Sequence, residues 1–62
     1  MYKKIYKHRE FRISLEKINN KKFIIKISFA DGLTYFKVAN SKAEADKIFD
    51  QEAIDWFRVY AA

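Results

Sequence analysis

The chain has 62 residues, no cysteine, one histidine and a formal net charge of +5. This length allows one domain, and the composition excludes disulfides, thiolate metal sites and clusters of histidine ligands. Half of the residues are apolar and 18% are aromatic, which is enough for a hydrophobic core. No apolar run approaches the roughly 20 residues of a membrane span, and no signal peptide is visible. We therefore expect a single domain over residues 1–62, cytoplasmic and without a membrane partner.

Basic and acidic residues are distributed unevenly along the chain. Residues 1–40 contain ten Lys and Arg and three Asp and Glu, which gives this part a net charge of +7. Residues 41–62 contain three basic and five acidic residues, which gives −2. One side of the folded protein should therefore be basic, and a basic side favours an anionic partner. The alternative is that the lysines serve only solubility.

The first ten residues, MYKKIYKHRE, do not follow one pattern. Tyr2, Ile5 and Tyr6 are compatible with an extension of the first strand or with packing on the end of a C-terminal helix. The remaining alternative is a basic arm over residues 1–10. The sequence leaves these alternatives open.

Three strands are predicted after residue 10, because apolar and polar residues alternate in three stretches. A period of two is typical of a half-buried strand. Turn-prone residues 19–22 separate the first two stretches. Asp31-Gly32 separates the second and third, and this pair favours a two-residue type I′ turn with positive φ at both positions. The predicted strands cover residues 11–16, 23–30 and 33–39.

The second hairpin has a predicted register. The two-residue turn places Phe36 opposite Ile27 and Val38 opposite Ile25, with all four side chains on the buried face. On the other face, this register and that of the first hairpin together align Ser14, Lys26 and Lys37 in one row and Arg12, Ser28 and Tyr35 in the next.

The first hairpin also has a predicted register. A three-residue loop over residues 19–21 pairs Leu15 with Ile25 and keeps the apolar side chains of both strands on one face. This loop requires a left-handed backbone at Asn20 or Lys21.

A helix is predicted to begin at a capping box formed by Ser41 and Glu44 and to end at Val59 or Tyr60. Its apolar stripe would cover one face of the sheet, because a small antiparallel sheet needs such a cover. The predicted fold class is therefore α+β, a three-stranded antiparallel β-meander (β-β-β-α) with one C-terminal helix packed on one face. The predicted core consists of Phe23, Ile25, Ile27, Phe29, Phe36, Val38, Ile48, Phe49 and Trp56.

No group of residues points to catalysis. His8 lies between Lys7 and Arg9, without a Ser or Cys that could act as a nucleophile, and a single glycine excludes a glycine-rich phosphate loop. The carboxylates of the predicted helix are spaced for local ion pairs. We expect a non-enzymatic protein with no cofactor and no metal, acting through a surface.

Two surfaces are candidates for binding. The first is the exposed face of the sheet, where Lys and Arg could contact phosphates and Tyr35 could stack on a base. The second is the end of the helix, where Ile54 and Phe57 lie off the apolar stripe and could bind a protein or a second copy of the chain. The alternatives are a solvated sheet face and a helix end covered by the first residues. The expected nucleic-acid-binding residues are Arg12, Lys26, Tyr35 and Lys37 on the sheet face, supplemented by Lys3, Lys4, Lys7 and Arg9 from the N-terminal arm.

The Asp31-Gly32 turn followed by Ser41-Lys42-Ala43-Glu44-Ala45 resembles the three-strand-plus-helix DNA-binding domains of phage-type integrases, over residues 11–60. In size and architecture the chain also resembles small phage-encoded inhibitors, including anti-CRISPR proteins. The resemblance implies a phage or mobile-element accessory protein that binds nucleic acid or a nucleoprotein complex through its basic sheet face. The alternative is an inhibitor of the anti-CRISPR or anti-defence type that docks on a host complex through the apolar helix end.

Overall fold

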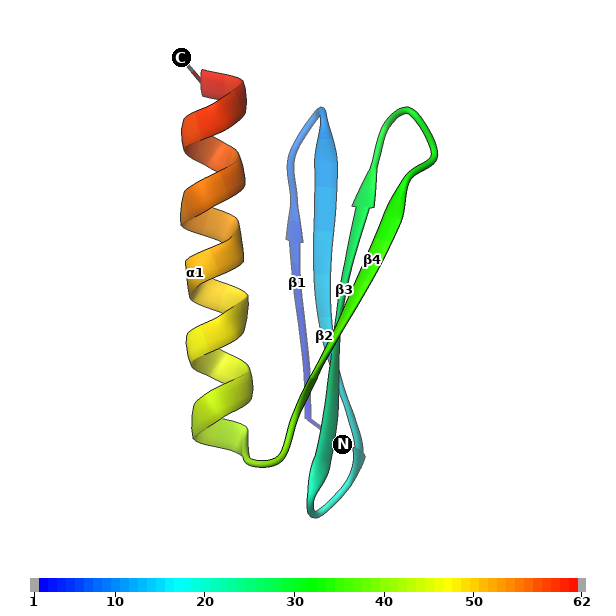
Figure 1. Cartoon of the computed structure of the whole chain (residues 1–62), viewed down its shortest axis with the longest axis vertical. Coiled ribbons are helices and arrows are strands. Elements are labelled where there is room, and N and C mark those ends of the chain that lie inside the picture. The colour runs from blue at the N-terminus through cyan, green and yellow to red at the C-terminus, as the bar shows by residue number, and fades with distance from the viewer. Residues whose placement is uncertain (1, 62) are drawn as a thin grey trace.

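Four antiparallel strands form one sheet in chain order, and the C-terminal helix lies along one of its faces (Figure 1). This computed structural model describes residues 2–61. The α+β class and the C-terminal helix are confirmed, whereas the predicted number of three strands is wrong because the sheet has four. No helix in the described part of the chain is long and apolar enough to cross a membrane. The elements are β1 (Lys3–Lys7), β2 (Phe11–Asn19), β3 (Lys22–Phe29), β4 (Thr34–Ala39) and α1 (Lys42–Ala61).

The additional strand is β1, which forms one edge of the sheet. It pairs with β2 from Lys3 opposite Glu16 to Lys7 opposite Arg12. A tight turn separates the two strands, because the His8 N–H donates to the Phe11 carbonyl over 2.8 Å. The N-terminal segment is therefore a separate strand of the sheet, rather than an arm or an extension of β2.

The register of the first hairpin is confirmed, but its turn differs from the prediction. Leu15 lies opposite Ile25, as expected. The pairing then shifts through a bulge between Lys17 and Asn19, so that Asn19 lies opposite Lys22 and only two residues remain in the turn. No residue other than Gly32 has a positive φ within residues 2–61, so the predicted left-handed Asn20 or Lys21 is wrong.

The predicted register of the second hairpin is wrong by one residue. Phe36 lies opposite Lys26, and Tyr35 lies opposite Ile27. The turn has three residues, because the Phe29 N–H donates to the Leu33 carbonyl over 2.8 Å. Only Gly32 has a positive φ, 101°, whereas a type I′ turn needs two such residues.

This shift reverses the two faces of β4, because side chains alternate between faces along a strand. Phe36 and Val38 point away from the helix and are 64% and 56% exposed. Their predicted place in the core is therefore wrong, and Ala39 is the one buried residue of β4.

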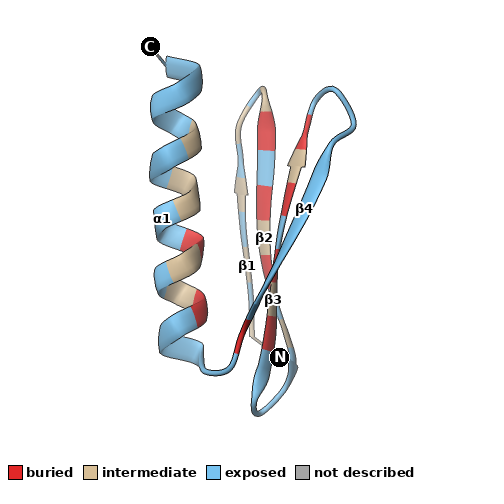
Figure 2. Cartoon of the chain, viewed as in Figure 1, coloured by how far each residue is buried: buried red, intermediate tan, exposed pale blue. Residues whose placement is uncertain are grey.

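The core lies between α1 and the sheet, and Figure 2 shows its buried residues alternating along β2 and β3. The prediction is confirmed for Phe23, Ile25, Ile27, Phe29 and Phe49, while Ile48 and Trp56 pack against the core and are partly buried. The core is completed by Phe11, Ile13, Leu15, Ala39 and Ala45.

The helix begins at the predicted cap. The Glu44 N–H donates to Ser41 Oγ over 3.1 Å, and this bond satisfies one of the free donors of the first turn. The Glu44 carboxylate accepts from the Asn40 N–H at 2.8 Å, one residue before the position expected for a capping box. These bonds fix the start of α1 directly after β4, so the helix must return across the sheet.

Candidate nucleic-acid interface

The sheet face opposite α1 is formed by alternate residues of all four strands, and we call it the open face. The strand pairings order these residues in three rows that run across the sheet. The rows are Lys3, Glu16, Ile24 and Val38; Ile5, Ser14, Lys26 and Phe36; and Lys7, Arg12, Ser28 and Thr34.

The open face carries four exposed cations and one acid. Lys3, Lys7, Arg12 and Lys26 all extend into solvent, and Glu16 is the only carboxylate among the residues of the three rows. None of the four cations forms an ion pair within residues 2–61. Their charges are therefore available to an external anion.

The centre of the open face is slightly hollow. A shallow depression of about 260 Å³ lies between β1, β2 and β3, and cationic and hydroxyl side chains line most of it. Such donors are the groups that proteins use to contact phosphate oxygens. The lining residues are Lys3, Ile5, Arg12, Ser14, Glu16, Lys26 and Ser28.

Phe36 adds an exposed aromatic ring to the open face. Lys26 Nζ lies 6.0 Å from the centroid of this ring, at the outer limit of a cation–π contact. The ring is 64% exposed, so it can accept a stacking partner such as an unpaired base. Phe36 was not among the expected binding residues, because the predicted two-residue turn placed it in the core.

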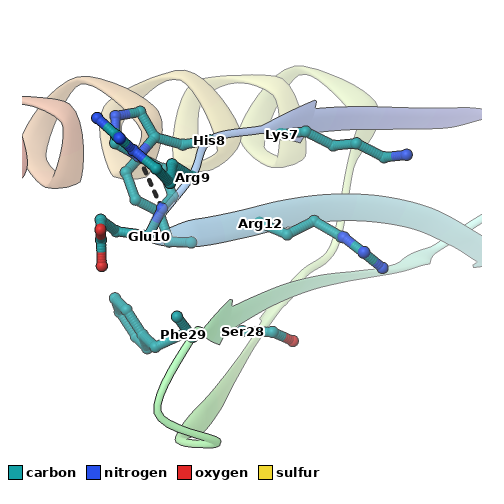
Figure 3. Close-up of a pocket in the computed structure, with 9 residues that line it drawn as sticks. Lys7, His8, Arg9, Glu10, Arg12, Ser28 and Phe29 are labelled. Atoms are coloured by element: carbon teal, nitrogen blue, oxygen red, sulfur yellow. Dashed lines mark hydrogen bonds between the residues drawn. The ribbon is translucent and has the colours of Figure 1, made fainter.

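A second depression, of about 350 Å³, continues the basic surface at the turn between β1 and β2. Figure 3 shows Lys7 and Arg12 extending from neighbouring strands in the same direction, with Arg9 in the turn itself. His8 is half-buried and stacks on Phe11 with the ring centroids 4.6 Å apart. Its Nδ1 accepts from the Glu10 N–H over 3.0 Å, so His8 has a packing role in this turn.

Three of the eight expected nucleic-acid-binding residues lie on the helix side of the sheet. Lys37 Nζ is 2.8 Å from Glu52 Oε2, and Lys4 Nζ is 3.4 Å from Asp46 Oδ1. Tyr35 packs edge-on against Phe29 at 5.7 Å between ring centroids. Tyr35 and Lys37 are misplaced by the register shift, and Lys4 is misplaced because successive residues of β1 face opposite ways. The other five, Lys3, Lys7, Arg9, Arg12 and Lys26, remain on the open face or at its corner.

Charges on the helix side are largely balanced. Lys4 also lies 3.8 Å from Asp50 Oδ1 and 4.7 Å above the ring of Phe49. The Tyr2 hydroxyl donates to the Asp46 carboxylate, and this bond is the largest cause of the lowered Asp46 pKa. Because these cations have acidic partners, the net positive charge of the sheet is concentrated on the open face.

The apolar end of the helix forms a groove with the edge of β1, and we call it the helix-end groove. Its volume is about 500 Å³, and its walls are Tyr6, Ala53, Ile54, Phe57 and Arg58. Ile54 and Phe57 are 47% and 48% exposed, so Tyr6 lines the groove without covering it. Ile5 takes no part, because it lies on the open face.

Comparison with known proteins finds no matching protein family, no matching curated protein and no matching solved structure. Within residues 2–61, no group of three or more His, Asp or Glu side chains converges as a possible metal site. The open face and the helix-end groove are therefore the two candidate binding surfaces.

Proposed function

We propose that this protein is non-enzymatic and binds nucleic acid, or a nucleoprotein complex, through the open face. The supporting observation is that Lys3, Lys7, Arg12 and Lys26 share one face of the sheet without an acidic partner in the described chain. Lysine and arginine contacts to phosphates supply most of the sequence-independent affinity for nucleic acid.

Phe36 favours a single-stranded ligand over a duplex. The bases of a duplex are stacked on one another, whereas an unpaired base can stack on an exposed aromatic ring beside a cationic groove. RNA-binding sheets with sequence preference use two or three such rings, and the three rows of the open face contain one. We therefore propose a ligand held mainly by its phosphates, with little discrimination between bases.

The test is the replacement of two central cations. Arg12→Glu with Lys26→Glu should abolish binding of a fluorescent single-stranded oligonucleotide, measured by anisotropy at low salt. A plot of the logarithm of the wild-type association constant against the logarithm of salt concentration should have a slope of about −0.7 for each phosphate neutralised. The matched control is Lys21→Glu with Lys47→Glu, which makes the same charge change at exposed positions outside the open face. Equal losses in both double variants, or no binding by the wild type, would refute the proposal.

One observation favours a second candidate function, which is docking on a protein. The helix-end groove is apolar and half-exposed, and its aromatic and aliphatic side chains are of the kind that anchor protein interfaces. An inhibitor of a host complex would use this groove in place of the open face.

A further inference from the structure

The strand β4 leaves one edge of the sheet unpaired. The bond from the Phe29 N–H to the Leu33 carbonyl shows that Leu33 directs its carbonyl toward β3. Backbone groups alternate in direction along an antiparallel strand, so Tyr35 and Lys37 also face β3. The N–H and carbonyl groups of Thr34, Phe36 and Val38 consequently point away from the sheet.

The side chains of β4 offer little protection to this edge. Figure 2 shows the strand exposed along almost its whole length, and only Ala39 is buried. Leu33, Tyr35, Phe36 and Val38 are each more than half exposed. Proteins usually protect a free edge with charges, proline or a bulge. The only charge of β4 is Lys37, which is paired with Glu52.

The opposite edge of the sheet has the protection that β4 lacks. Three of the five residues of β1 are lysines, at positions 3, 4 and 7. Two copies of β1 side by side would bring these lysines together, and like charges on neighbouring strands are destabilising. Charge therefore disfavours association through β1 and permits it through β4.

We propose that β4 pairs antiparallel with β4 of a second copy of this chain. A twofold axis at Phe36 lets the outward-facing backbone groups of both strands bond, and it places Thr34 opposite Val38 of the second copy. Tyr35 then lies opposite Lys37 of the second copy, so no like charges face each other. The contact is isologous and closes after two copies.

This dimer would be an eight-stranded sheet with both helices on one face and both open faces on the other. The two Phe36 rings would meet at its centre with a Lys26 beside each, because Lys26 lies opposite Phe36 within each copy. A short strand pair buries less than the roughly 800 Å² per partner of a standard stable interface. We therefore expect a dimer that dissociates on dilution.

The test is sedimentation velocity over a series of protein concentrations. Wild-type protein should shift from monomer to dimer as concentration rises, and Thr34→Lys with Val38→Lys should stay monomeric because it sets Lys against Lys twice across the twofold axis. Thr34→Glu with Val38→Lys should restore the dimer, since opposite charges then face each other in the same register. Both positions are exposed in the monomer, so circular dichroism should show an unchanged fold.

The control is Ile18→Lys with Asn20→Lys, which adds the same charge at exposed positions away from β4 and should dimerise like the wild type. A wild type that remains monomeric at its solubility limit, or a dimer that survives Thr34→Lys with Val38→Lys, would overturn the proposal. So would failure of the opposite-charge variant to dimerise. Thr34 and Val38 belong to the open face, so the proposed function is tested separately, by oligonucleotide binding of the wild type and of Arg12→Glu with Lys26→Glu, both of which leave β4 unchanged.

Discussion

At the scale of single residues, Tyr2 and Asp46 connect the start of the edge strand β1 to the first turns of α1. The Tyr2 hydroxyl donates to the Asp46 carboxylate, and Lys4 lies beside the same carboxylate at 3.4 Å. The hydrogen bond, with a smaller contribution from burial, raises the pKa of Tyr2 from 10.0 to about 12. The same bond, aided by Lys4, lowers the pKa of Asp46 below its ordinary value of 3.8. Tyr2 therefore stays a neutral phenol and Asp46 an ionised carboxylate over a wide range of pH.

Removal of the phenol hydroxyl by Tyr2→Phe should lower the melting temperature in a pH-dependent way. Because the folded pKa of Asp46 is lowered, its contribution is present above pH 3.8 and is lost as the pH falls through the lowered value. Because the folded pKa of Tyr2 is raised, its contribution is present below pH 10.0 and is lost as the pH rises through about 12.

Thermal unfolding across pH should therefore show wild type and Tyr2→Phe differing at neutral pH and converging at both extremes. Tyr60→Phe is the control, since the Tyr60 hydroxyl has no hydrogen-bond partner in the part of the chain that the structure describes. Because Tyr2→Phe keeps the ring, a difference that persists at strongly acidic pH would show that the hydroxyl stabilises the fold without the ionised Asp46 carboxylate.

At the scale of elements, one turn residue decides which face of β4 is buried. Gly32 has a φ of 101°, and a Cβ added there would meet no atom within 4 Å. Any loss of stability on substitution must therefore come from the backbone conformation. The three-residue turn that Gly32 permits directs Phe36 to the open face and Tyr35 toward the helix.

Gly32→Ala should destabilise the protein by about 1–2 kcal/mol, the usual cost of a left-handed conformation in a residue with a Cβ. Gly32→Asn should cost less, because asparagine tolerates positive φ better than alanine. The free energies of unfolding in urea measure both. If Gly32→Ala is as stable as the wild type, the turn does not need positive φ and the placement of Phe36 loses its basis.

The elements that the sequence predicted well are those with one clear pattern. In β2 and β3, apolar side chains occupy one face, so the pairing of Leu15 with Ile25 followed from the alternation. The helix start followed from Ser41 and Glu44, whose bonds involve only neighbouring residues. On the open face, Arg12 and Lys26 lie where the alternation placed them, whereas Lys3 and Lys7 were expected in an N-terminal arm and lie instead in β1.

The elements that the sequence did not predict lack such a pattern. Both faces of β4 carry apolar side chains, so the alternation did not indicate which face is buried. The assumed length of the turn therefore decided the predicted register. In β1, Lys4 occupies a helix-facing position and places its ammonium above Phe49. A lysine can cover apolar surface with its stem, and this use is invisible in a pattern of apolar and polar residues.

At the scale of the whole molecule, a single helix covers one face of a sheet, and the principal dimensions are 36 × 20 × 16 Å. The helix-end groove lies between the last turns of α1 and the edge of β1, where the sheet leaves Ile54 and Phe57 about half exposed.

Ile54→Ser with Phe57→Ser should leave the protein folded and less destabilised than Phe49→Ala. Each groove residue is about half exposed and so gives up about half of the roughly 1.5–3 kcal/mol of full burial, whereas a buried Phe→Ala change costs about 3–5 kcal/mol. Urea denaturation measures the comparison, and oligonucleotide binding through the open face should not change. If the double variant loses as much stability as Phe49→Ala, the groove belongs to the core and the docking candidate loses its support.

The separation of charge between the two faces also gives the molecule an electric dipole that points from the helix toward the open face. The helix carries a net charge of −2, which Lys4 and Lys37 on the same side of the sheet offset, whereas the open face carries +3 from four cations and one acid. In the field of a polyanion, a free molecule would experience a torque that turns the sheet toward the polymer before any contact forms. Orientation during approach accelerates association and is weakened by salt, because ions screen the field beyond about 8–10 Å. Orientation during approach would then be a property of the whole fold, because the helix acids pair with Lys4 and Lys37 and leave the excess positive charge on the open face.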